Sequence, residues 1–279
     1  MSVVLLSFAD SRYEYSLKRI EKESADFPID EFHFLSEKNL PKDLLKSINP
    51  KLYRRGFGYW RWKPYIVLCQ IEKMKDGDIL IYSDAGITWN PNGVERFVEY
   101  VQMLKHASVD YLVFQQPFLE KDYNKWELLH FLNVVEDEKI LMSLQILAGL
   151  FMIKKSPSSL SFLKEWQNIM INNFDLISDK NTKHGNLRGF IEHRHDQSVF
   201  SILVKKREHI QISWNEIESL QNNYESLSCC PFHVHKTSFY AKNTIFRKLK
   251  SLYTLPYRLL IGYYLKYCKD FYFFKKVSW

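Results

Sequence analysis

Short apolar segments alternate with amphipathic segments along most of the chain. Apolar or alternating runs of strand length predict β-strands at residues 3–8, 31–35, 79–82, 110–114 and 148–155. Apolar residues at helical spacing predict helices at residues 11–24, 63–77, 92–106, 156–170 and 196–206. Because strands that alternate with helices form a mostly parallel sheet with helices on its faces, we expect one α/β body.

The stretch GDILIYSDAG, from Gly77 to Gly86, is an apolar strand that ends on a single carboxylate. In an open α/β sheet, ligands bind outside the carboxyl ends of the strands. Asp84, and Asp10 after the first strand, are therefore expected at the binding edge. A carboxylate there can hold Mg²⁺ or Mn²⁺ against a diphosphate. The alternative is a turn of small residues in which Asp84 caps the following segment.

A second stretch, RRGFGYWRWKP at residues 54–64, combines cations, glycines and large aromatic side chains just before a predicted helix. Arg54, Arg55 and Lys63 can neutralise phosphate. The face of Trp60 can stack on a sugar or a base. The stretch predicts one wall of a binding site; the alternative is a loop that its tryptophans hold over the sheet.

The motif HRHDQS, residues 193–198, opens a predicted helix. Asp196 can simply cap that helix. If it faces a cleft instead, its carboxylate can orient a hydroxyl or act as a base. Both interpretations follow equally from the sequence.

The motif PFHVHKT, residues 231–237, carries two histidines two residues apart. Side chains at this spacing point the same way in an extended segment, so His233 and His235 share one side. Followed by Lys236, they can supply a metal ligand and a phosphate contact. Each histidine alone can also be an ordinary surface residue.

Composition and charge divide the chain into two parts. Of the 279 residues, 46% are hydrophobic and 25% charged, as in ordinary globular proteins. The net charge of +7 is concentrated in residues 241–279, which hold nine Lys/Arg and one acid. The rest is close to neutral and has no nucleic-acid-binding motif, so we expect no nucleic-acid partner. We expect one domain at residues 1–237 and a basic, aromatic, helical extension at residues 238–279.

The extension and the cysteines bear on location. The longest uncharged run of the extension, residues 259–265, is shorter than the ~20 residues of a membrane-spanning helix. The extension can dock on the body, or it can lie on an anionic membrane surface. The four cysteines lack metal-ligand spacing, and the first residues lack a signal-peptide pattern. These features predict a cytoplasmic protein.

Several enzyme classes are disfavoured because their motifs are absent from the sequence. There is no HExxH or CxxC spacing for zinc, no GxSxG nucleophile elbow and no GxxxxGK[ST] phosphate loop.

Taken in order, GFGYWRWKPY, DILIYSDAG, ILAGLFMIKKS, HRHDQSVFSIL and HVHK resemble GT-A-fold glycosyltransferases that use nucleotide sugars, in particular bacterial enzymes of capsule, O-antigen and lipooligosaccharide assembly. The resemblance covers residues 1–237 and implies a Rossmann-like sheet flanked by helices. It implies transfer of a sugar from a nucleoside diphosphate, with a UDP-sugar as the expected donor. The acceptor would be a hydroxyl of a glycan or lipid-linked oligosaccharide, at the cytoplasmic face of the inner membrane if the extension binds lipid. The alternative is a non-catalytic sugar- or nucleic-acid-binding protein.

The resemblance also implies roles for single residues. His193, Asp196 and Gln197 would contact the transferred sugar or the acceptor, with Asp196 as the carboxylate at the reaction centre. Asp84 and His235 would hold Mn²⁺ or Mg²⁺. The residues expected at the donor nucleotide, its diphosphate and its sugar are Ala9, Asp10, Arg54, Arg55, Trp60, Lys63, Asp84, Ala148, Gly149 and Lys236.

The metal motif departs from the family pattern. That motif usually has two acids, whereas Ser83 and Gly86 flank a single Asp84 here. Either the metal binds more weakly, or the cations Arg54, Arg55 and Lys63 share the neutralisation of the diphosphate.

Overall fold

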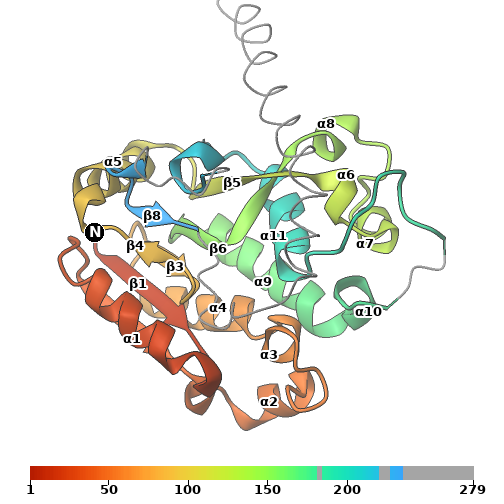
Figure 1. Cartoon of the computed structure of the whole chain (residues 1–279), viewed down its shortest axis with the longest axis horizontal. Coiled ribbons are helices and arrows are strands. Elements are labelled where there is room, and N and C mark those ends of the chain that lie inside the picture. The colour runs from red at the N-terminus through yellow and green to blue at the C-terminus, as the bar shows by residue number, and fades with distance from the viewer. Residues whose placement is uncertain (181–183, 220–226, 235–279) are drawn as a thin grey trace, which may run out of the picture.

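The computed structural model of the protein describes residues 1–180, 184–219 and 227–234 (Figure 1). Its strands are β1 (Val3–Phe8), β2 (Glu31–Leu35), β3 (Ile79–Ser83), β4 (Thr88–Trp89), β5 (Tyr111–Leu119), β6 (Leu144–Lys154), β7 (Ile210–Ile212) and β8 (Phe232–His233). Its α-helices are α1 (Glu14–Glu23), α2 (Lys42–Ile48), α3 (Gly56–Tyr59), α4 (Lys63–Lys73), α5 (Val94–His106), α6 (Glu120–Tyr123), α7 (Trp126–Phe131), α8 (Glu138–Leu141), α9 (Pro157–Asn172), α10 (Phe174–Ile177) and α11 (Asp196–Lys205). The predicted extension at residues 238–279 lies outside the described residues.

A six-stranded sheet, in the order β2-β1-β3-β6-β5-β7, forms the centre of the described chain. Strand β1 pairs in parallel with β2 and β3, and β5 pairs in parallel with β7. Strand β6 runs antiparallel to both of its neighbours, β3 and β5. The α/β class and the mostly parallel sheet are therefore confirmed. The direction of β6 was not predicted, because an apolar run does not indicate which way a strand points.

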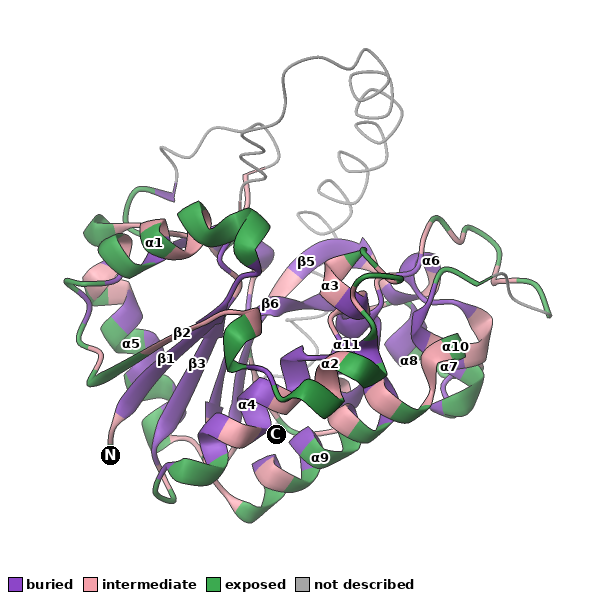
Figure 2. Cartoon of the chain, turned by 90° about the horizontal axis from the view of Figure 1, so that it is seen from below, coloured by how far each residue is buried: buried purple, intermediate pink, exposed green. Residues whose placement is uncertain are grey.

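Helices cover both faces of this sheet, and the alternation of side chains along β1 explains why. Val4 and Leu6 join an apolar cluster with residues of α4, α9 and α11. Val3 and Leu5, on the opposite face, join a second cluster with residues of α1 and α5. Figure 2 shows the buried strands between these two helical layers.

The predicted strands and helices recur with shifted ends. The helix predicted at 63–77 ends at Lys73, and the strands predicted at 110–114 and 148–155 continue as β5 and β6. Polar residues interrupt the apolar runs of both strands, at Gln115 in β5 and Gln145 in β6. These interruptions made both strands look shorter than they are.

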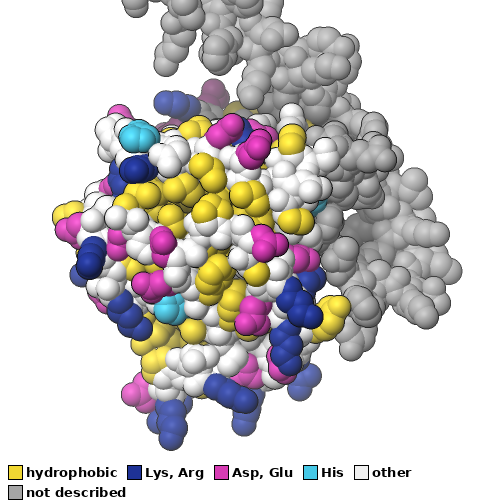
Figure 3. All heavy atoms as spheres, turned by 90° about the vertical axis from the view of Figure 1, so that its left-hand side faces the viewer, with side chains coloured by type: hydrophobic (Ala, Val, Ile, Leu, Met, Phe, Trp, Pro, Cys, Tyr) yellow, Lys and Arg dark blue, Asp and Glu magenta, His cyan; other side chains and the backbone are white. Residues whose placement is uncertain are grey.

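The surface carries charges of both signs. On the face shown in Figure 3, basic and acidic side chains are interspersed over the described part of the chain. A continuous basic surface, which nucleic-acid binding requires, does not occur on that part of the face. None of the helices placed by the structure is both long enough and apolar enough to cross a membrane.

Candidate functional site

A cleft of about 770 Å³ opens where β3 ends beside the middle of β6. Because β6 is antiparallel to β3, Ser83 pairs with Leu150, and the next residue, Asp84, donates its backbone N–H to the Gly149 carbonyl (2.7 Å). The cleft thus lies at the carboxyl end of β3, where an open α/β sheet binds ligands. The predicted site residues that line it are Arg55, Trp60, Lys63, Asp84, Ala148, Gly149, His193, Asp196 and Gln197.

Lys63 joins the two predicted carboxylates. Its Nζ lies 2.6 Å from Oδ2 of Asp196 and 3.3 Å from Oδ1 of Asp84, and it also donates to the Ala148 carbonyl (3.2 Å). The lysine side chain is 2% exposed, against 36% for Asp84. Residues 63, 84 and 196 therefore form one charge cluster at the bottom of the cleft, with Asp84 the more accessible carboxylate.

Asp84 is held on two further sides. The Tyr82 hydroxyl donates to its Oδ1 (2.6 Å). A Cβ added at Gly149 would lie 2.7 Å from its Oδ2, closer than a real Cβ contact, so this approach requires glycine. The strand end, the tyrosine and the glycine thus fix the carboxylate at the cleft.

The pKa values of the cluster follow from burial and from neighbouring charge. Burial disfavours the charged form of Lys63, but the charges of Asp196 and Asp84 outweigh it and raise the lysine pKa. Burial raises the pKa of Asp196 against the effect of Lys63. Burial and the Asp84 charge raise the pKa of Tyr82 well above its ordinary value, so its hydroxyl remains a donor.

His193 and His195 also line the cleft, and both are buried. His193 accepts the Lys125 backbone N–H through Nδ1 (3.4 Å), whereas Nδ1 of His195 donates to the Ile177 carbonyl (2.6 Å). Burial lowers the pKa of His193 well below its ordinary range and lowers that of His195 to about 4. Both rings are therefore neutral at neutral pH.

The wall predicted from residues 54–64 adopts an unusual backbone. All residues from Gly56 to Trp60 have positive φ, between 53° and 92°. Non-glycine residues in this region cost roughly 1–2 kcal/mol each. The turn brings the Trp60 indole onto the His195 ring, with centroids 5.5 Å apart and planes at 20°. It therefore places an aromatic face at the cleft.

Two arginines of the cleft were not predicted. Arg19, on α1, donates to the carbonyls of Ala85 (2.9 Å) and Ile87 (3.0 Å) in the loop after Asp84. The Arg194 guanidinium lies over the Phe118 ring, 3.9 Å from its centroid. The motif at residues 193–198 contains Arg194, but the roles predicted there were those of His193, Asp196 and Gln197. Nothing in the pattern of residues 11–24 distinguished Arg19 from a surface residue.

Other predicted residues lie elsewhere. Ala9, Asp10 and Arg54 do not line this cleft among the described residues. The Asp10 carboxylate binds the Arg12 guanidinium (2.6 Å) and caps the 3-10 turn Ser11–Tyr13. Burial opposes this ion pair, but Arg12 lowers the Asp10 pKa.

The late histidine motif is described only in part. His233 lies in β8, where it hydrogen-bonds the Leu227 carbonyl through Nε2 (2.9 Å). Val234, the next residue, lines the cleft. His235 and Lys236 lie outside the described residues, so their predicted roles stay predictions.

The described residues do not by themselves fit a divalent metal. They contain no group of three His, Cys, Asp or Glu side chains that could hold one. Oδ1 of Asp84 already accepts from Tyr82 and lies 3.3 Å from the Lys63 ammonium, whose charge disfavours a second cation there. We therefore derive no step through a metal ion.

Comparisons with known proteins give structural matches alone. No protein-family model matches the chain, and no curated protein matches it. A glycosyltransferase involved in the glycosylation of the major capsid of PBCV-1 is similar at 11% identity and a TM-score of 0.48, over 85% of this chain and 95% of that one. Mouse xyloside xylosyltransferase 1 is similar at 12% identity and a TM-score of 0.41, over 84% of this chain and 81% of that one.

The galactosyltransferase LgtC, in complex with donor and acceptor sugar analogues, is similar at 15% identity and a TM-score of 0.40, over 78% of this chain and 75% of that one. These three structures are glycosyltransferases. Because the scores are below 0.5, the activity proposed for this chain rests on the residues of its own cleft.

Proposed function

We propose that the chain is a glycosyltransferase that moves a sugar from a nucleoside diphosphate, a UDP-sugar, to a hydroxyl of a glycan or lipid-linked acceptor. The observation that carries the proposal is the contact of Lys63 with Asp84 and Asp196 in the cleft at the end of β3. The cluster places a carboxylate for a hydroxyl proton in a cleft that arginines also line, and an inverting sugar transfer uses such a base together with cations for the leaving group.

Asp196 is the proposed base. In an inverting transfer the acceptor hydroxyl gives its proton to a carboxylate while its oxygen bonds to the anomeric carbon. Burial raises the Asp196 pKa, and a raised carboxyl pKa suits proton transfer near neutral pH. Lys63 donates to Oδ2 of Asp196, which fixes the side chain at the cleft.

The leaving diphosphate needs positive charge. As the bond from the anomeric carbon to the phosphate oxygen breaks, its electron pair passes to the diphosphate. Arg19, Arg55 and Arg194 line the same cleft as Lys63. Arg55 is accessible, since its side chain is 48% exposed while it pairs with Asp179 (2.7 Å). These cations can bind the donor and stabilise the charge that develops.

The predicted metal pair, Asp84 with His235, stays part of the proposal as a separate question. Mn²⁺ or Mg²⁺ would add charge neutralisation at the diphosphate. Assays with Mn²⁺, with Mg²⁺ and with a chelator measure that contribution directly. The role in surface polysaccharide synthesis and at a membrane likewise stays a prediction from the sequence.

Replacement of the proposed base tests the reaction. Asp196→Asn keeps the side-chain size but cannot accept the proton, so we expect the turnover of UDP-glucose or UDP-galactose with an acceptor glycan to fall about 10²–10⁴-fold. UDP affinity, measured by calorimetry, stays unchanged, because the nucleotide does not need the base.

Asp43→Asn is the matched control, since Asp43 is exposed on α2. It leaves both turnover and UDP affinity at the wild-type values. Wild-type turnover in Asp196→Asn would contradict the role of Asp196. Binding of UDP-sugars without turnover in the wild type would favour the non-catalytic sugar-binding protein instead.

A further inference from the structure

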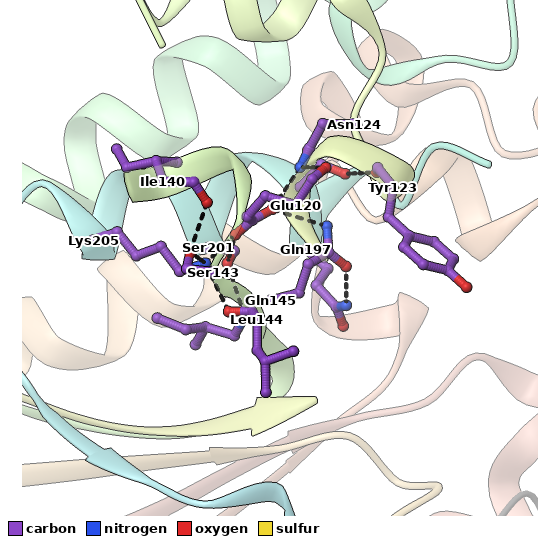
Figure 4. A network of polar contacts seen from close by, with 12 residues as sticks. Glu120, Tyr123, Asn124, Ile140, Ser143, Leu144, Gln145, Gln197, Ser201 and Lys205 are labelled. Carbon is purple, nitrogen blue, oxygen red and sulfur yellow. Dashed lines mark hydrogen bonds and ion pairs between the residues drawn. The ribbon is translucent and has the colours of Figure 1, made fainter. Parts of the chain in front are cut away.

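A buried polar network lies behind the cleft and is not explained by the transfer chemistry described above. Glu120, on α6, is fully buried, and Lys205, at the end of α11, is 7% exposed. Their side chains form an ion pair with Oε1 and Nζ 2.6 Å apart. Figure 4 shows the network around them, with Gln145 and Gln197 among its members.

Helix α11 contributes three members on one face. Gln197, Ser201 and Lys205 are spaced four residues apart, and such residues lie one above another along a helix. Ser201 and Lys205 bind Glu120 directly. Gln197 lies at the other end of this row and lines the cleft.

The donors around Glu120 fill its carboxylate. Oε1 accepts from the Ser201 hydroxyl and from Lys205, and Oε2 accepts from Asn124 (2.5 Å) and from Nε2 of Gln145 (3.1 Å). A carboxylate has about four lone-pair sites, so these contacts use all of them. Ser201 also accepts the Ile146 backbone N–H (2.8 Å), and its single hydroxyl proton is then directed at the Glu120 carboxylate, which can only accept.

Lys205, at the end of the network away from the cleft, fixes which groups donate and which accept. Besides Glu120, its ammonium donates to the Ser143 hydroxyl (2.7 Å) and to the Leu144 carbonyl (2.7 Å), which uses all three of its protons. Glu120 thus has a charged partner and acts as an acceptor. Gln145 must turn its NH₂ group toward it.

This polarity passes from one amide to the next. Because the NH₂ group of Gln145 faces Glu120, its carbonyl oxygen faces Gln197, and Gln197 must donate in turn, through Nε2 at 2.8 Å. The carbonyl oxygen of Gln197 is then left as an acceptor for a ligand in the cleft, beside the second N–H of its NH₂ group. An amide without such neighbours can bind in either orientation.

We propose that Gln145 and Glu120 are positioning residues, which fix the Gln197 amide with its oxygen toward the cleft as an acceptor for a hydroxyl of the donor sugar. This inference rests on the proposed function. It assigns Gln197 a defined polarity: one N–H is committed to Gln145, and the carbonyl oxygen accepts from a sugar hydroxyl. A bare nucleoside diphosphate lacks that hydroxyl and does not depend on the network.

The difference between nucleotide and nucleotide sugar therefore gives the test. We would measure by calorimetry the affinities of the full chain for UDP, UDP-glucose and UDP-galactose. The quantity to compare is the affinity ratio, the affinity for a UDP-sugar divided by the affinity for UDP. Gln145→Met keeps the length of the side chain but removes the amide that links Glu120 to Gln197. Glu120→Gln introduces an amide that can donate as well as accept, so the hydrogen bonds of Gln145 and Gln197 can reverse direction. Each is expected to lower the ratio for the preferred sugar about tenfold, the value of one buried hydrogen bond, with UDP affinity unchanged.

Two further variants separate positioning from general damage. Ser143→Ala removes a partner of Lys205 but leaves the contacts of Glu120 and Gln145, so the ratio stays at the wild-type value. In Gln197→Leu the ratio falls, and adding Gln145→Met to it lowers the ratio no further, because Gln145 acts through Gln197. Unchanged UDP affinity shows, in the same sample, that each variant is folded.

Failure of the proposed function and failure of the positioning role give different results. If the wild type binds UDP and the UDP-sugars equally and transfers nothing, the proposed function fails, and this inference fails with it. If the wild type prefers a UDP-sugar but both Gln145→Met and Glu120→Gln keep its ratio, the positioning role alone is overturned. The positioning role would also be overturned if the double variant Gln145→Met with Gln197→Leu had a lower affinity ratio than Gln197→Leu alone.

Discussion

A fully buried lysine is stable only beside negative charge, and Lys63 has two carboxylates within hydrogen-bonding or ion-pair distance. The same contacts offset the repulsion between the carboxylates of Asp84 and Asp196. At the scale of single residues, Lys63 therefore serves both the fold and the charge balance of the cleft.

Lys63→Met is expected to destabilise the protein strongly. Removal of the ammonium leaves two neighbouring carboxylates without their counter-charge, and breaking a buried pair costs about 3–5 kcal/mol. Urea denaturation measures the free energy of unfolding. Lys73→Met, an exposed position on the same helix α4, is the matched control and stays close to the wild type. Equal stability of the two variants would contradict a buried charge cluster.

The lowered pKa of His195 makes the stability of the protein depend on pH. Burial lowers its pKa to about 4 from an ordinary value of 6.5. As the pH falls through about 6.5, the unfolded state binds a proton that the folded state resists, so stability falls until about pH 4. The loss from this residue is at most about 3 kcal/mol.

Denaturation curves at pH 7, 6, 5 and 4.5 measure this effect. His195→Asn, which tolerates the positive φ of this position, should lose less stability between pH 7 and 4.5 than the wild type does. His106→Gln, at an exposed position, should follow the wild type. A parallel pH dependence in wild type and His195→Asn would exclude a buried neutral His195.

At the scale of elements, three segments far apart in sequence build the cleft. Strand β3 delivers Asp84, the first turn of α11 delivers Asp196, and α4 begins at Lys63 between them. The left-handed turn Gly56–Trp60 before α4 adds its aromatic face. Its backbone is held by packing as well as by hydrogen bonds, such as Trp62 Nε1 to the Gly56 carbonyl (3.0 Å).

Substitutions at Gly58 and Gly77 separate the cost of backbone strain from the cost of overpacking. Both have positive φ, +92° and +87°, but a Cβ at Gly58 would lie 2.9 Å from Ile48, whereas nothing lies within 4 Å at Gly77. Gly77→Ala is expected to cost about 1 kcal/mol from backbone strain alone. Gly58→Ala adds about 1–3 kcal/mol from overpacking. Thermal denaturation compares them, and equal losses would contradict close packing of the turn on α2.

The sequence predicted those elements whose pattern is local. The apolar runs of β1 and β3 and the helical spacing of α9 and α11 are enough to identify these elements from the sequence. Short elements such as α6 and α8 were missed, because four residues are too few to show a period.

The site could be predicted in part for the same reason. Asp84 and Asp196 could be predicted because each lies at a recognisable element boundary: Asp84 directly after β3, and Asp196 at the start of α11. The contact between them through Lys63 depends on how β3, α4 and α11 pack, which no local pattern contains. Glu120 and Gln145 were missed because a polar residue beside an apolar run is usually exposed, and the burial of both depends on how β6 and α11 pack.

At the scale of the whole molecule, charge and architecture point to one working face. The cleft lies at the carboxyl end of β3 and holds several cations, while residues 1–240 together are nearly neutral and residues 241–279 hold most of the net positive charge. A small anionic ligand would therefore be attracted to the cleft by local charges rather than by the field of the body as a whole.

In the proposed function, this cleft binds the nucleoside diphosphate of a sugar donor. We would first measure the thermal denaturation of the full chain with UDP, GDP, CDP and ADP, each with and without Mn²⁺. One nucleotide is expected to raise the melting temperature by about 5 °C when present at about 100 times its Kd. Arg55→Gln, in the cleft, reduces this rise, whereas the neighbouring Arg54→Gln, outside it, leaves it unchanged. Binding of a nucleoside diphosphate in the cleft would be contradicted if no nucleotide raised the melting temperature, with or without Mn²⁺. It would also be contradicted if both variants reduced the rise equally.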